Sequence, residues 1–295
     1  MENLEQKALL VTYSASSWSG KAPSKQAEKD IQDRRGNADG TTKTHVNLVD
    51  EGEIKKNSKA SGAVYSWYRE NTLPWENRRG GARLLPGANY ERFSSGLPAR
   101  VENANARADE FAEIYPRLKV EWEPMLKGLV ETIDPKFYPP AELMRGLFSL
   151  SVTYLPLPIS PGSLTLKFLG RAELDALKAQ IGPQWKAQEQ AATAEIYKRL
   201  AEAVGHMADT LADPQAIFRD SLVLNLKELC SLIPDLNFTE NRELAELNEA
   251  TREKLAGIDP ETLRTDLKIR GQIAGEAGAL LAQITGAGAR FIDMS

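Results

Sequence analysis

Histidine and cysteine are scarce in this 295-residue chain, which contains two histidines and one cysteine. Zinc sites need several of these residues at set spacings, but His45, His206 and Cys230 lie far apart in sequence, so we expect no metal site. The same scarcity argues against a Ser-His-Asp or Cys-His arrangement for nucleophilic catalysis. Cys230 falls on an apolar helical face, which is typical of a buried structural thiol. We therefore expect no metal and no cofactor.

An enzyme is accordingly not the class of protein that the sequence favours. Acidic residues are plentiful in the C-terminal half, for instance at positions 243, 246, 249 and 253, but basic residues lie beside them. That pattern is typical of a solvated, ion-paired helix face. A hydrolase or transferase that uses these carboxylates is the least favoured alternative.

Long apolar runs are also missing. The longest, such as residues 8–11 and 279–282, fall far short of a bilayer span, so we expect no membrane-spanning helix. The first residues lack the basic and apolar regions of a secretory signal, from which we expect a cytoplasmic protein. With 42% hydrophobic and 26% charged residues, the composition is that of a globular protein. A chain of this length buries a sizeable core without disulfides.

A small sheet is predicted from three short segments. Residues 8–14 combine β-branched and aromatic residues, and residues 148–157 alternate apolar and polar positions. Residues 164–169 repeat the alternation after a turn rich in proline and serine, which predicts a hairpin. Because two strands alone are marginally stable in water, we expect residues 8–14 to pair with this hairpin in a three-stranded sheet.

Helices are predicted almost throughout the sequence after Arg171. An apolar stripe with spacings of three or four residues marks one core-facing helix, and it consists of Ile196, Leu200, Val204, Met207 and Leu211. Helix starts are predicted at Asp213-Pro214, near Asn237 and at Asp259-Pro260, because each place offers a capping side chain. Well-delimited helices of this kind favour an antiparallel bundle.

The predicted fold class is therefore mainly α, of the α+β type, with a C-terminal antiparallel helical bundle, a small antiparallel β-sheet and a long irregular basic loop. Residues 1–170 should form an N-terminal α+β region, and residues 171–295 should form the bundle. Because the first strand is expected to pair with the middle of the chain, we predict one integrated unit. Pro116 and Pro124 should divide the helical region 104–133 into shorter pieces.

Positive charge is concentrated in one part of the chain, although the formal net charge is −4. Residues 1–107 contain 17 Lys and Arg against 13 Asp and Glu, and residues 108–295 contain 20 against 28. Residues 55–107 alone contain ten basic and four acidic residues. A basic segment on an acidic body indicates an anionic partner, or the acidic surface of a neighbouring subunit.

This basic segment, residues 55–107, also contains tyrosine, tryptophan and phenylalanine. Cations that meet phosphates and rings that stack on unpaired bases are typical of proteins that bind single-stranded nucleic acid. The candidate nucleic-acid-binding residues are Lys55, Lys56, Lys59, Tyr68, Arg69, Trp75, Arg78, Arg79, Arg83, Tyr90, Arg92 and Phe93. We predict a self-assembling protein without enzymatic activity that binds single-stranded nucleic acid, DNA rather than RNA, with a role in replication or recombination such as annealing.

Two alternatives remain open for the same residues. In the first, Val64, Trp67 and Tyr68 form the buried side of a helix near residues 56–70, and the loop that follows simply packs over the core. In the second, the loop binds a protein partner or the neighbouring subunit of a homo-oligomer, because Tyr, Trp and Arg dominate protein interfaces. The protein would then be an interaction scaffold, an adaptor or an inhibitor of a host system.

The stretch from Leu9 to Lys21 reads LLVTYSASSWSGK. Together with the strand pair in the middle of the chain and the leucine-rich helices after Phe218, it resembles an uncharacterised family of bacteriophage and plasmid proteins of about this length. The resemblance implies a phage-encoded cytoplasmic protein linked to DNA metabolism. It implies no catalytic residues.

Overall fold

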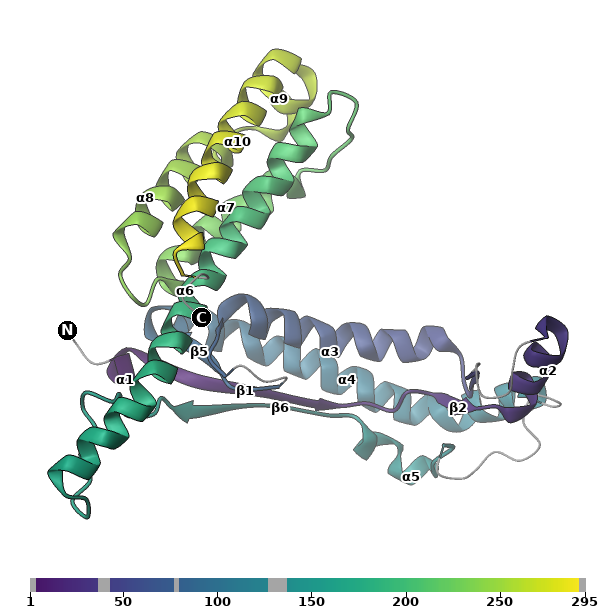
Figure 1. Cartoon of the computed structure of the whole chain (residues 1–295). Coiled ribbons are helices and arrows are strands. Elements are labelled where there is room, and N and C mark those ends of the chain that lie inside the picture. The colour runs from purple at the N-terminus through teal and green to yellow at the C-terminus, as the bar shows by residue number, and fades with distance from the viewer. Residues whose placement is uncertain (1–3, 37–42, 77–79, 127–136, 292–295) are drawn as a thin grey trace. The chain divides into compact units, whose positions relative to one another are not determined.

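The computed structural model describes residues 4–36, 43–76, 80–126 and 137–291. Figure 1 shows a mainly α-helical chain with a small antiparallel sheet, which confirms the predicted fold class. Among the described residues, no helix is long and apolar enough to cross a membrane.

The chain divides into two compact units. The first consists of Met1–Thr12, Arg69–Phe93 and Thr153–Ser295, and the second of Tyr13–Tyr68 and Ser94–Val152. The boundaries of these units differ from residue 170, where we expected the N-terminal region to end. Residues 8–12 of the N-terminal strand and part of the basic segment belong with the C-terminal helices, because both contribute buried side chains to the same core.

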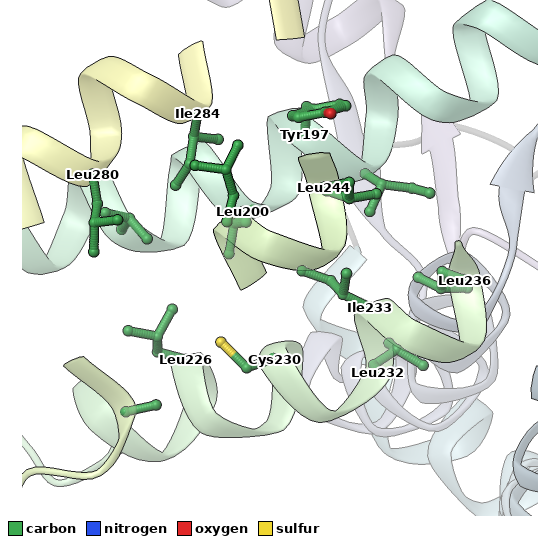
Figure 2. Close-up of a cluster of buried hydrophobic side chains, with 14 of the residues drawn as sticks. Tyr197, Leu200, Leu226, Cys230, Leu232, Ile233, Leu236, Leu244, Leu280 and Ile284 are labelled. Carbon is green, nitrogen blue, oxygen red and sulfur yellow. The ribbon is translucent and has the colours of Figure 1, made fainter. Parts of the chain in front are cut away.

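The C-terminal half of the first unit is the predicted bundle. Its helices, drawn from green to yellow in Figure 1, are α6 (Arg171–Ala212), α7 (Ser221–Leu236), α8 (Arg242–Thr251), α9 (Pro260–Thr265) and α10 (Leu267–Ala289). All five residues of the predicted apolar stripe on α6 are buried. Figure 2 shows Leu200 of this stripe facing Leu226, Cys230 and Ile233 of α7 and Leu280 and Ile284 of α10. Burial raises the pKa of the Cys230 thiol to about 11, as suits a structural thiol.

The capping side chains predicted one helix start correctly and another one wrongly. Asp259 caps α9 by accepting from the Thr262 amide, with Pro260 at the first helical position, as predicted. The prediction of a helix start at Asp213-Pro214 is wrong, because these residues lie in the turn that follows α6. The buried guanidinium of Arg270 accounts for that turn. It donates to four carbonyl oxygens at and after the end of α6, those of Thr210, Leu211, Asp213 and Ala216.

The sheet has four strands in the order β4 (Leu73–Pro74), β5 (Arg83–Pro86), β1 (Ala8–Ser16) and β6 (Ser149–Pro156). Strands β1 and β6 occupy two of the predicted segments, but residues 164–169 form no strand, so the predicted hairpin is wrong. The other neighbour of β1 is β5, and Leu10 of β1 pairs with Leu84 of β5 in antiparallel register. Leu84 and Leu85 are fully buried, whereas residues 164–169 contain no fully buried side chain to offer.

The long irregular loop that we predicted in the basic segment is also wrong over most of residues 71–103. The structure has β4 and β5 there, and α4 (Tyr90–Trp122) begins inside it. Helix α4 continues through Pro116, where we expected a break. A proline in a helix interior costs about 3 kcal/mol, but Phe111, Tyr115 and Leu118 flank it and are buried. Their packing keeps this stretch helical.

The second unit is built on α3 (Glu51–Asn71) and α4, which supply residues 51–68 and 94–122 to it. Smaller elements complete it: α2 (Lys25–Arg35), α5 (Ala141–Met144) and a two-stranded antiparallel sheet of β2 (Lys21–Pro23) and β3 (His45–Asn47). The core gathers around Phe111 and Tyr115. Trp18, from the Trp-Ser-Gly stretch, packs on both rings and donates to the Phe137 carbonyl at 3.1 Å.

Candidate functional site

Arg83 of the basic segment is a helix cap in this structure. Its Nε donates to the Thr72 hydroxyl at 2.8 Å and one Nη donates to the Thr72 carbonyl at 2.8 Å, just past the end of α3. The last carbonyls of a helix have no partner within the helix and carry partial negative charge, so they attract a cation. Arg83 was predicted to contact nucleic acid, but the fold holds its guanidinium at the α3 terminus.

A second arginine caps the same terminus. Arg199 of α6 donates to the carbonyls of Arg69, Glu70 and Thr72 at 2.9, 2.7 and 2.8 Å. It also forms an ion pair with Glu195 at 3.2 Å. Burial lowers the pKa of Arg199, and the nearby Glu195 opposes that shift. The end of α3 is therefore closed by two guanidinium groups within the first unit.

Three of the predicted base-stacking rings are buried. Trp75 packs edge-on against Trp185 of α6, with 5.2 Å between ring centroids, and Phe93 is fully buried. Tyr68, in the second unit, stacks on Tyr13 at 5.7 Å. These rings are unavailable to a base while the units stay folded, so the prediction that they bind nucleic acid is corrected. An aromatic ring in a core gains more from the burial of apolar area than it would gain at a wet surface.

The structural alternative for residues 56–70 agrees with α3. Val64 and Tyr68 are buried, as that alternative required. Trp67 is half-buried, and the guanidinium of Arg100 lies 3.9 Å from the centroid of its ring. This face of the helix contributes to the core of the second unit.

The remaining candidates are exposed or only partly buried. Lys55 and Lys56 are exposed and form ion pairs with Glu51 at 3.0 Å and Glu53 at 2.8 Å. The other candidates of this kind are Lys59, Arg69 and Tyr90, which are exposed, and Arg92, which is half-buried. Arg78 and Arg79 lie outside the described residues. The lysines belong to the second unit and the others to the first, so the predicted site is not one cluster within either unit.

A different surface stands out in the first unit. Residues 153–169, which we call the neutral segment, contain a single charged residue, Lys167, although charged residues make up 26% of the whole chain. Leu157 is the one buried residue of these 17, all of which the structure describes. Several large apolar side chains of the segment are exposed, namely Tyr154, Leu155, Ile159 and Phe168 at 38, 42, 57 and 81%.

The fold holds the neutral segment at a few points. Tyr154 packs against Tyr90 and Phe93, with 6.1 Å between centroids in each case. Burial raises the pKa of Tyr154, and Tyr90 raises it further. Leu157 joins the core of the unit, and the Ser160 hydroxyl donates to Glu5 at 3.3 Å. The segment is thus attached to the unit while most of its surface faces solvent.

Sequence reasoning placed these residues in a hairpin and missed their exposure. The signal that was available is the absence of charge, since residues 146–166 contain no Asp, Glu, Lys or Arg at all. An uncharged strand is usually a buried one, which is why the pattern favoured a sheet. Only burial in the structure separates an uncharged core strand from an uncharged surface.

A groove of about 570 Å³ lies between α6 and α7 in the first unit. Ala203, Leu222, Leu226 and Leu229 contribute apolar surface to it, and polar side chains such as His206 also line it. A cavity of about 280 Å³ shares Arg199 and Leu229 with the groove. The guanidinium of Arg199 is already used to cap α3. No group of three or more His, Cys, Asp or Glu side chains suited to a metal ion occurs in the described part of the chain.

Comparisons with known proteins give no relative. No family model matches the chain, and no curated protein or solved structure is similar to it.

Proposed function

We propose that this protein is an interaction scaffold that binds another protein chain through the neutral segment, residues 153–169. One observation supports the proposal: 16 of these 17 residues are exposed or half-buried, and a single residue among them is charged. The core of a protein interface is depleted in charged residues and enriched in aromatic and apolar ones. An exposed apolar surface of this kind marks an interaction site more often than a solvated face.

The proline content of the neutral segment fits the same function. Pro156, Pro158 and Pro161 each fix one backbone torsion angle, so the segment has fewer conformations to lose when a partner binds. Attachment through Leu157 and Tyr154 restricts it further. A surface held in place before binding pays a smaller entropic cost on association, and affinity rises accordingly.

Binding of single-stranded DNA, in a phage or plasmid setting, is the second candidate function. One observation favours it, which is that Lys55, Lys56 and Lys59 are all exposed on α3. The lysines offer less to a ligand than the neutral segment does, because two of them are paired with glutamates and three of the expected stacking rings are buried. A role as an adaptor or an inhibitor of a host system is compatible with the first candidate.

Site-specific photo-crosslinking tests the proposed function. A photoreactive phenylalanine analogue at position 159 or 168 of the full chain should give adducts with protein on irradiation of cells that make it. The matched controls are positions 224 and 267, where Leu224 and Leu267 are 52 and 62% exposed in the same unit but outside the neutral segment. The proposal fails if the two pairs of positions give equal yields, and adducts with nucleic acid at 159 or 168 would favour the second candidate.

A further inference from the structure

The strand that leads into the neutral segment is an edge strand. Among the described residues, β6 is the last strand of the sheet and pairs on one side with β1. Edge strands present unpaired backbone donors and acceptors, and proteins usually protect them with charged side chains, bulges or covering segments. Strand β6 contains no charged residue, and Pro156, which lacks an amide hydrogen, stands at its end.

Side chains on both faces of the end of β6 are exposed. Residues 153–156 are all exposed, although neighbouring side chains of a strand point to opposite faces. Tyr154 therefore has exposed surface on one face, and Leu155 on the other. A partner that covered only one face would leave one of these two apolar side chains in water. A partner strand beside β6 would cover both.

We propose that the partner is a second copy of this chain, and that the β6 strands of the two copies pair antiparallel about a two-fold axis beside Leu155. This inference rests on the proposed function and names its partner. In this register Leu155 of each copy lies opposite Leu155 of the other, and Tyr154 lies opposite Pro156. Residues directly opposite in an antiparallel pair share a face, so the two leucines meet on one face of the joined sheet and each tyrosine meets a proline on the other.

The lack of charge is what favours a second copy over an unrelated strand. Across a two-fold axis each residue lies near its own copy, so any charge close to the axis would repel itself. Residues 153–156 carry no charge, and the next charged residue after them is Lys167. Recognition of a different protein commonly uses charge patterns that exclude wrong partners, and this strand has none.

Cysteine crosslinking tests the register. Leu155→Cys and Tyr154→Cys are made separately in the full chain. Opposed residues lie about 5 Å apart in an antiparallel pair, within reach of a disulfide. Leu155→Cys should therefore form a disulfide-linked homodimer on mild oxidation. Tyr154→Cys should not, because position 154 lies opposite position 156 and is offset along the strand from position 154 of the other copy. The native Cys230 is buried, and the wild-type protein controls for it.

Sedimentation velocity tests the partner without relying on cysteines. The wild-type protein should shift from monomer to dimer with rising concentration, and Leu155→Lys should weaken the dimer by at least about tenfold because two ammonium groups then meet near the axis. Leu267→Lys is the matched control, since Leu267 is a more exposed leucine of the same unit and is distant in sequence from β6. It should leave the dimer unchanged.

The outcomes separate this inference from the proposed function. A wild-type protein that stays monomeric, or a Tyr154→Cys variant that links to itself as readily as Leu155→Cys does, overturns self-pairing through β6. If positions 159 and 168 still crosslink to a different protein, the interaction function stands with another partner. If neither self-association nor position-dependent protein adducts occur, both proposals fail.

Discussion

Two segments of the first unit differ in how the fold uses their chemistry. Residues 69–93 are rich in arginine and aromatic rings, and the fold uses Arg83, Trp75 and Phe93 internally. Residues 153–169 have one charged residue, yet most of their surface is exposed. Arg83, Trp75 and Phe93 looked functional by type but are structural, and the segment that looked structural by pattern is exposed.

The contrast shows how arginine can be consumed inside a fold. A guanidinium has five N–H donors in a fixed fork, so it satisfies several carbonyls at once where a helix ends. Arg83 and Arg199 close α3 in this way, and Arg270 closes α6. A cluster of arginines near glycine and tryptophan therefore indicates nucleic-acid binding only when the helix ends nearby have other caps.

The largest effect is expected from a matched pair of phenylalanine substitutions. Phe93→Ala should lower the free energy of unfolding by about 3–5 kcal/mol, because it removes a fully buried ring and leaves a cavity. Phe168→Ala should change it by less than about 0.5 kcal/mol in the monomer, because that side chain is mostly exposed. Urea denaturation followed by circular dichroism measures both. Equal losses would mean that the neutral segment is part of the core.

A smaller effect is expected from the α3 cap. Arg199→Met should destabilise the protein by about 2 kcal/mol, since three carbonyls each lose one hydrogen bond, of which the Thr72 carbonyl keeps that from Arg83, and Glu195 loses its partner. Arg242→Met is the control. Arg242 forms the same kind of ion pair with a glutamate four residues away, but its side chain is almost fully exposed, so the cost should stay below about 0.5 kcal/mol. Similar losses for both variants would contradict a capping role.

The third prediction concerns any binding of a single-stranded oligonucleotide. Arg83→Ala should leave the slope of log affinity against log salt unchanged, because the Arg83 guanidinium is engaged with Thr72. Substitution of Lys55, Lys56 and Lys59 together by alanine should reduce the slope by about 2 if all three meet phosphates. Fluorescence anisotropy over a salt series gives both slopes. A reduced slope for Arg83→Ala would mean that Arg83 contacts a phosphate, as the sequence predicted.

Local chemistry explains which parts of the fold were predictable. The stripe from Ile196 to Leu211 was readable because helical periodicity is set by residues three and four apart. The cap at Asp259 was readable because capping side chain and amide lie within one turn. The start of α7 was not, since the turn after Asp213 depends on Arg270, which follows it by 57 residues.

Contacts between residues distant in sequence also explain why the candidate site was not predicted correctly. The caps on α3 join Arg199 to carbonyls up to 130 residues away, and nothing near Arg83 in sequence announces that its guanidinium is used. The exposure of Phe168 likewise depends on strand pairing across the chain, because β5 takes the second place beside β1 and residues 164–169 form no strand. Which of several apolar strands is buried follows from competition across the whole chain. A reading of single segments does not resolve that competition.

The smallest expected effect is a shift in the titration of Tyr154. Burial raises its pKa first and Tyr90 adds to the shift, so Tyr90→Phe should lower the pKa of Tyr154 part of the way toward its ordinary value. A raised pKa favours the neutral phenol, so the associated stability is present below pH 10 and is lost as the pH rises through the pKa in the folded state. Nuclear magnetic resonance of ring-labelled tyrosine follows this titration.

The same titration of Tyr154 at different protein concentrations compares the neutral segment with the basic one. If a second copy covers Tyr154, its phenol is further desolvated in the dimer, so the pKa of Tyr154 should be higher at high protein concentration than at low. Leu155→Lys should abolish this concentration dependence, because it weakens the dimer while Tyr90 and Phe93 stay in place. A pKa of Tyr154 that is equally raised at every concentration would show that its own unit supplies all of the burial, and the neutral segment would then resemble the basic one.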